Sequence, residues 1–70
     1  MSISHKLLGI NSNWTATPSR EGWKHYRIAA RRYNEGELLV EMMAVCDRSV
    51  RFWVAAHLLK EGAGWRPGWD

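Results

Sequence analysis

Apolar and polar residues alternate along the segment KHYRIAARRY, which covers residues 24–33. The apolar set, on one side of an extended chain, is Tyr26, Ile28 and Ala30. The polar set, on the opposite side, is His25, Arg27 and Arg31. Successive side chains of a strand point to opposite faces of its sheet, so this spacing predicts a half-buried β-strand with a basic outer side.

The next two segments fit two kinds of structure. In ELLVEMMAVC, residues 37–46, both sides of a strand would be largely apolar. In VRFWVAAHLL, residues 50–59, apolar residues alternate but also follow helical spacing. Ser49 could cap such a helix, Gly62 could end it, and the abundance of Leu, Met, Ala and Glu favours helix formation. The pattern alone leaves open an antiparallel β-meander and a small α-helical bundle.

Residues that favour turns divide the chain into short pieces. Loops rich in Gly, Asn, Ser and Pro surround a short extended piece at Trp14–Thr17. The segment YNEGE, residues 33–37, predicts a turn in which Asn34 and Gly36 take positive φ. Since no repeat or long linker divides the chain, we expect a single small domain over residues 1–70.

Large aromatic rings are the expected source of stability. A chain of 70 residues has a small core and needs dense packing to fold alone. The single cysteine, Cys46, excludes an intramolecular disulfide and is expected to be a small inward-facing residue. In the final segment GWRPGWD, Pro67 and Gly68 allow the chain to bend back, so we expect the tail to cover the sheet and bury at least one ring. The predicted aromatic core and lid are Trp14, Tyr26, Phe52, Trp65 and Trp69.

Hydropathy and charge narrow the broad class of the protein. The first ten residues lack the charged start, long apolar run and cleavage site of a targeting segment, and the longest apolar stretch is far too short to span a membrane. The absence of a possible disulfide fits a reducing compartment. We therefore expect a cytoplasmic protein without membrane association. Ten Lys and Arg against seven Asp and Glu give a net charge of +3, which mildly favours an anionic partner.

Several short motifs come in a familiar order along nearly the whole chain. They are KLL at residues 6–8, WTA at 14–16, Pro18, KHY at 24–26, AV at 44–45, LK at 59–60, and Trp65 followed by Gly68 and Trp69. Together they resemble the small bacterial tryptophan-rich proteins of the DUF2389 family. Members of that family carry Val- and Thr-rich segments in the two ambiguous regions, which favours strands there.

The resemblance therefore implies an all-β fold for this chain. We expect an antiparallel β-meander curled into a small SH3-like barrel, with one helical turn at Leu58–Glu61. This chain departs from the family pattern at Ala56 and His57, where members usually have Trp-Arg. The departure removes an arginine that could bind an anion or brace the terminus. The resemblance implies no particular activity.

The residue types needed for catalysis are present, but they are not arranged as a known signature. A nucleophile needs an adjacent base, and nothing in the sequence places Cys46, His25 and His57 together. A zinc site would have to gather His5 with these same residues, which lack ligand spacing. We therefore predict a protein that is not an enzyme and has no catalytic residues, metal or cofactor.

A basic and aromatic face is the strongest functional lead. Single-stranded nucleic acids bind where cationic side chains surround exposed aromatic rings, and aromatic residues with arginine are also enriched at protein interfaces. Because small SH3-like barrels commonly act as adaptors, we expect first a protein-binding or assembly role, homodimerisation included, and second a single-stranded RNA- or DNA-binding role. The predicted binding face is Lys24, His25, Arg27, Arg31, Tyr33, Arg51 and Trp53.

Overall fold

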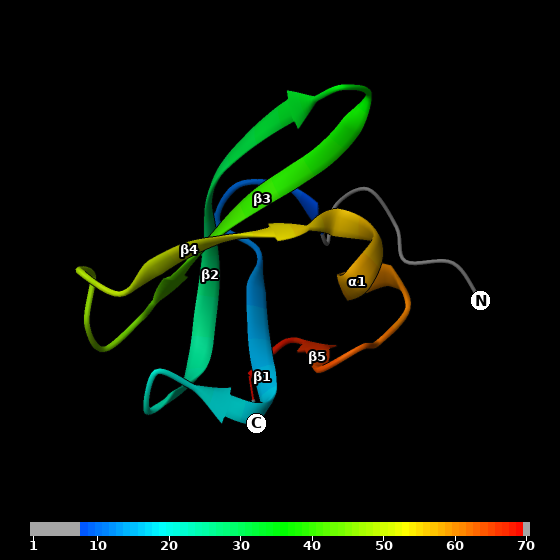
Figure 1. The fold of residues 1–70 in the computed structure, drawn as a ribbon. Helices are drawn as coiled ribbons and strands as arrows, with labels where there is room; N and C mark the ends of the chain where they lie inside the picture. The colour runs from blue at the N-terminus through cyan, green and yellow to red at the C-terminus, as the bar shows by residue number, and fades with distance from the viewer. Residues whose placement is uncertain (1–7, 70) are drawn as a thin grey trace.

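The structure is a computed structural model that describes residues 8–69. Its elements, shown in Figure 1, are β1 (Asn13–Arg20), β2 (Trp23–Asn34), β3 (Glu37–Ala44), β4 (Arg51–Ala55), α1 (Ala56–Lys60) and β5 (Trp65–Pro67). The five strands form one antiparallel sheet in the order β4-β3-β2-β1-β5. This arrangement confirms the predicted all-β meander, and the small helical bundle is not formed. Within residues 8–69 no pairing joins β4 to β5, so the sheet is open and the SH3-like barrel stays a prediction.

Two Glu-Gly turns set the register of the first three strands. Glu21 and Gly22 have φ values of 51° and 82°, and Glu35 and Gly36 have 53° and 82°. Two successive residues with positive φ form the tight connection that matches the twist of a β-hairpin. Positive φ was predicted at Asn34, but Asn34 is the last residue of β2 and pairs with Glu37. The first hairpin also makes β1 longer than the predicted extended piece, since pairing continues to Arg20.

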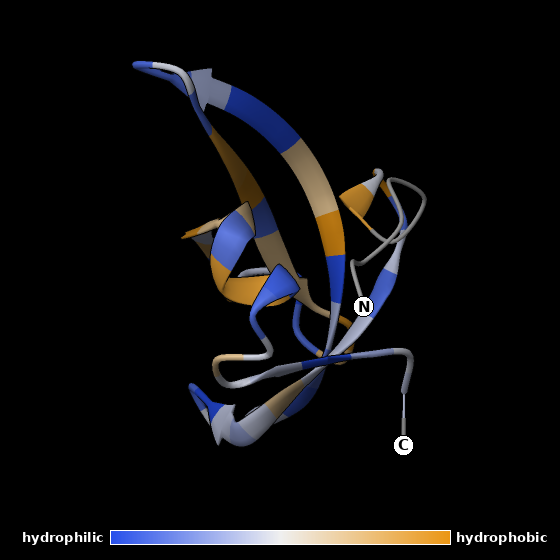
Figure 2. Cartoon of the chain, turned by 90° about the vertical axis from the view of Figure 1, so that its right-hand side faces the viewer, coloured by the Kyte–Doolittle hydropathy of each residue, from blue (hydrophilic) through white to orange (hydrophobic). Residues whose placement is uncertain are grey.

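The hydrophobic core lies on one face of the sheet, which we call the inner face. Figure 2 shows apolar and polar stretches following one another along the strands. The buried apolar residues are Leu8, Trp14, Ala16, Tyr26, Ile28, Val40, Met42, Ala44, Val54, Ala56, Leu59 and Trp65. Helix α1 packs on this face because Ala56 and Leu59, three positions apart, point to the same side of the helix. The helix begins two residues earlier than the predicted turn.

A β-bulge in β2 divides its side chains differently from simple alternation. Ile28 pairs with Met42, but the next pair along the strands is Ala30 with Glu41, so β2 contains one extra residue at this step. Side chains directly opposite each other in a sheet lie on the same face. Beyond the bulge Arg31 pairs with Val40 and Tyr33 with Leu38, and therefore both lie on the inner face.

The final segment wraps around the edge of β1 and places one tryptophan on each face of the sheet. Trp65 pairs with Ala16, and its side chain is 2% exposed in the core. Past β5, the Gly68 amide donates to the Asn13 carbonyl at 2.8 Å, and the Thr15 hydroxyl donates to the Gly68 carbonyl at 2.6 Å. These bonds turn the chain so that Trp69 lies on the opposite face.

Candidate functional site

The face opposite the core, which we call the outer face, carries three rows of side chains across β2, β3 and β4. Each row consists of one residue from each strand, taken from the pairing register. The rows are Arg27-Met43-Arg51, Ala30-Glu41-Trp53 and Arg32-Leu39-Ala55. Three arginines against one glutamate give this surface a net charge of +2. Helix α1 does not cover it, since the buried residues of that helix pack on the inner face.

The predicted binding face is therefore only partly correct as a geometric set. Arg27, Arg51 and Trp53 share the outer face, together with His25, which pairs with Thr15 beside Arg27. The prediction that Arg31 and Tyr33 join them is wrong, because the bulge turns both to the inner face. Lys24 is exposed near the start of β2. Because it alternates with His25, its side chain points to the other side of the sheet and does not join the outer face.

Two tryptophan rings dominate the outer face, and an arginine lies over each. The guanidinium carbon of Arg32 is 5.4 Å from the ring centre of Trp53, which is 41% exposed. The guanidinium carbon of Arg27 is 5.3 Å from the ring centre of Trp69, which is 40% exposed. An exposed cation–π contact contributes about 0.5–1 kcal/mol and orients both side chains. The rings are thus held in place and still accessible to a partner.

Trp69 is fixed to the sheet by a hydrogen bond as well. Its indole Nε1 donates to the Tyr26 carbonyl at 3.0 Å, and its ring centre lies 5.9 Å from that of His25. The ring covers Arg27, whose Nε atom is buried and has no hydrogen-bond partner in the described part of the chain. Trp69 therefore serves both as a brace for the tail and as part of the exposed surface.

Glu41 is the single carboxylate in the three rows. Its side chain is 19% exposed, and one of its oxygens lies 3.8 Å from an Arg51 guanidinium nitrogen. This separation exceeds hydrogen-bonding distance, so the pair is a loose one. Arg51 also donates from Nε to the Arg48 carbonyl at 2.8 Å, which fixes the guanidinium beside β4. A carboxylate from another molecule can therefore bind the Arg51 guanidinium without first breaking a close ion pair within the protein.

The aromatic residues predicted as core lie mostly on the inner face. Trp14, Tyr26 and Trp65 are buried, and the Tyr26 ring lies edge-on to both Trp65, at 5.3 Å, and the half-buried Phe52, at 5.4 Å. Burial raises the pKa of the Tyr26 hydroxyl, and the nearby Glu21 carboxylate adds to this effect. The same hydroxyl donates to the Arg20 carbonyl at 2.6 Å.

Among the described residues, those considered for catalysis or metal binding do not gather into a metal-ligand group. Cys46 is exposed, because it follows the end of β3 in a loop where strand alternation no longer applies; its predicted inward position is wrong. Residues 8–69 contain no group of three or more His, Cys, Asp or Glu side chains that could hold a metal ion. His5, which was considered for such a site, lies outside the described residues.

The predicted binding face left out Arg32 and Trp69, which both lie on the outer face. The adjacent Arg31 and Arg32 gave a usable signal, since consecutive residues of a strand cannot both point outward. The position of Trp69 had no such signal, because it depends on long-range hydrogen bonds between the tail and β1.

Fold and surface together define a small all-β protein with a basic, tryptophan-bearing sheet face. The chain belongs to the tryptophan-rich protein family DUF2389, whose family model matches residues 12–70. Comparisons with curated proteins and with solved structures gave no match. Among the described residues, no helix has the length and apolar character needed to cross a membrane.

Proposed function

We propose that this protein is a non-enzymatic binding module whose outer face docks an acidic segment of a protein partner. One observation carries the proposal: Trp53 and Trp69 are both partly exposed on the same positively charged face, each oriented by an arginine. Tryptophan and arginine supply most of the binding energy in many protein interfaces, since they combine large apolar area with directional polar contacts. A surface that holds both in fixed positions loses little entropy on binding.

The chemistry of the face favours a protein over a single-stranded nucleic acid. Successive bases need several accessible aromatic platforms. The outer face offers two, Trp53 and Trp69, because the other predicted ring, Tyr33, lies on the inner face. Half-buried apolar side chains, Leu39 and Met43, and a central carboxylate, Glu41, also lie between the arginines. Mixed apolar, aromatic and arginine content of this kind is typical of protein interfaces.

The expected partner segment is acidic and carries an apolar anchor. Its carboxylates would compete for the guanidinium groups of Arg32 and Arg51, which are exposed at the rim. Its apolar side chain would pack on the exposed part of the Trp53 ring. Charge attraction mainly raises the association rate, so binding should weaken as salt concentration rises.

Affinity capture from the native host tests this function with a pair of matched variants. The outer-face variant is Arg32→Glu with Trp53→Ser; the control is Arg31→Glu with Tyr33→Ser, which changes the same residue types on the inner face. We expect a defined set of proteins to bind wild type and control, but not the outer-face variant, before and after nuclease treatment. Capture that nuclease abolishes would replace the proposal with nucleic-acid binding. Equal capture by both variants would remove the outer face as the docking surface.

A further inference from the structure

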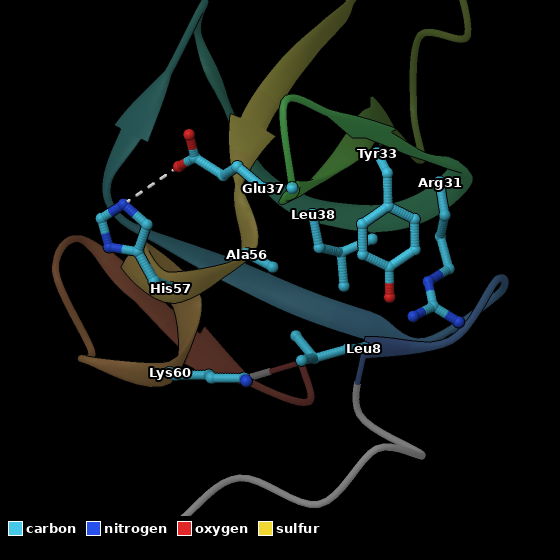
Figure 3. A pocket seen from close by; sticks show the side chains of 9 residues that line it. Leu8, Arg31, Tyr33, Glu37, Leu38, Ala56, His57 and Lys60 are labelled. Atoms are coloured by element: carbon cyan, nitrogen blue, oxygen red, sulfur yellow. Dashed lines mark ion pairs between the residues drawn. The ribbon is translucent and has the colours of Figure 1, made fainter.

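A cavity of about 400 Å³ lies on the inner face, away from the outer face, between the end of the β2–β3 hairpin and α1 (Figure 3). Its apolar wall consists of Leu8, Leu38 and Ala56. This volume is within the range of pockets that bind small molecules. The bulge in β2 shapes the cavity, because it turns Arg31 and Tyr33 inward beyond the last core residues.

Two cations and a phenol line the cavity without carboxylate partners. Arg31 and Lys60 form no ion pair with any carboxylate in residues 8–69. In Figure 3 the Tyr33 ring and the Arg31 guanidinium extend side by side, and the Lys60 side chain extends from α1 toward Leu8. Both side chains are exposed, so their charges face solvent at the border of the apolar wall.

The one carboxylate among the described lining residues, that of Glu37, points toward His57. Glu37 lines the same cavity, but one of its oxygens lies 3.3 Å from His57 Nε2. The other ring nitrogen of His57, Nδ1, lies 2.9 Å from a Glu61 oxygen. His57 thus joins the hairpin to α1 across one side of the cavity, as the dashed line in Figure 3 shows for Glu37. This contact draws the Glu37 carboxylate toward the helix.

We propose that this cavity binds a small organic anion with a flat apolar body and one carboxylate or phosphate group. The apolar body would pack against Leu38 and Ala56. The anionic group would accept charge-assisted hydrogen bonds from Arg31 and a further bond from the Tyr33 hydroxyl beside it, while Lys60, on the other side of Leu8 in Figure 3, would add charge attraction alone. Arginine can contact either anion with two parallel N–H groups, so carboxylate and phosphate are equally suitable here. The site is independent of the docking surface on the outer face.

Cinnamate, cinnamamide and phenyl phosphate are suitable probes, because they separate charge from shape. Binding is measured by titration of amide NMR signals, with Gly36, Leu38 and Ala56 as reporters of the cavity. We expect cinnamate to bind with a Kd of about 1 mM or tighter, as its size allows. Cinnamamide has the same shape without the charge, and it should bind at least about tenfold more weakly. Phenyl phosphate shows whether the cavity prefers phosphate to carboxylate.

Neighbouring arginines on β2 supply the matched controls. Arg31→Gln should weaken cinnamate binding about tenfold or more, and Lys60→Gln should weaken it in the same direction. Arg32→Gln should leave it unchanged, because Arg32 lies on the outer face. All three side chains are exposed, so these variants are expected to fold. The proposal is overturned if the reporters do not shift with either anion, if cinnamamide binds as tightly as cinnamate, or if Arg32→Gln weakens binding as much as Arg31→Gln.

Discussion

The two tryptophans of the tail should contribute very differently to stability, although they are only four residues apart. Trp65 is 2% exposed and its ring contacts Tyr26, with Arg20 over it at 5.2 Å. Trp69 is 40% exposed and its anchors are the hydrogen bond to the Tyr26 carbonyl and the contact with Arg27. Replacing each residue by alanine therefore removes a core ring in one case and a surface ring in the other.

The expected losses in the free energy of unfolding follow from the apolar area that each substitution exposes and from the cavity that it leaves. Burial of a tryptophan removes roughly 200 Å² from water, which at about 25 cal/mol per Å² stabilises the fold by about 5 kcal/mol. Core Trp→Ala substitutions cost about 3–5 kcal/mol, so we expect about 4–5 kcal/mol for Trp65→Ala. The ring of Trp69 is about three-fifths buried and leaves no closed cavity, so Trp69→Ala should cost about 2–3 kcal/mol. A 70-residue domain has a total stability of about 4–10 kcal/mol, and thus Trp65→Ala approaches the limit of folding.

Urea unfolding followed by far-ultraviolet circular dichroism measures both costs without relying on tryptophan emission. If Trp65→Ala fails to fold while Trp69→Ala folds, that failure is itself the larger loss, and Trp65→Phe then shows that the position accepts another large aromatic ring. This substitution also removes an indole N–H that is buried without a hydrogen-bond partner in residues 8–69, so the expected cost is about 1 kcal/mol or less. A larger loss for Trp69→Ala than for Trp65→Ala would refute the assignment of the two faces.

Three further predictions concern the turns and the titrating groups. Glu35→Asn should stabilise the fold by a few tenths of a kcal/mol to about 1 kcal/mol in thermal melts, because asparagine before Gly36 suits two positive φ values. Because the pKa of Tyr26 is raised, its neutral hydroxyl contributes stability that is fully present below pH 10.0 and is lost as pH rises through the folded-state pKa. Tyr26→Phe should remove this alkaline loss, as measured by urea unfolding at a series of pH values. Hydrogen bonds from Ser49 lower the pKa of the Asp47 carboxyl, so a carbon-detected NMR titration should show an upward shift in Ser49→Ala.

The sequence pattern was sufficient to predict those strands whose burial is visible in the alternation of neighbouring residues. The alternation in residues 24–28 correctly placed Tyr26 and Ile28 inside and Arg27 outside. The ambiguity of residues 37–55 arose because β3 carries apolar residues on both faces: Val40 and Met42 are buried in the core, whereas Leu39 and Met43 are half-buried on the outer face. Resemblance to the family resolved this ambiguity in favour of strands, as the structure confirms.

The candidate site was harder to predict, because it depends on two non-local features. The bulge falls at Ala29 and Ala30, whose small side chains fit either face and so give no hydrophobic signal. The position of Trp69 depends on the pairing of β5 with β1, which joins residues about 50 positions apart and has no pattern in the sequence. One extra residue in β2 therefore decided which arginines share a face.

Side-chain nuclear Overhauser effects test the division of the two faces most directly, since the docking surface and the cavity both depend on it. The structure predicts contacts between the Arg32 side chain and the Trp53 ring, and between the Tyr33 ring and the Leu38 methyl groups. Contacts of the Trp53 ring with Arg31 in place of Arg32 would show that β2 alternates without a bulge. That result would contradict both the basic, tryptophan-bearing outer face and the anion site on the inner face.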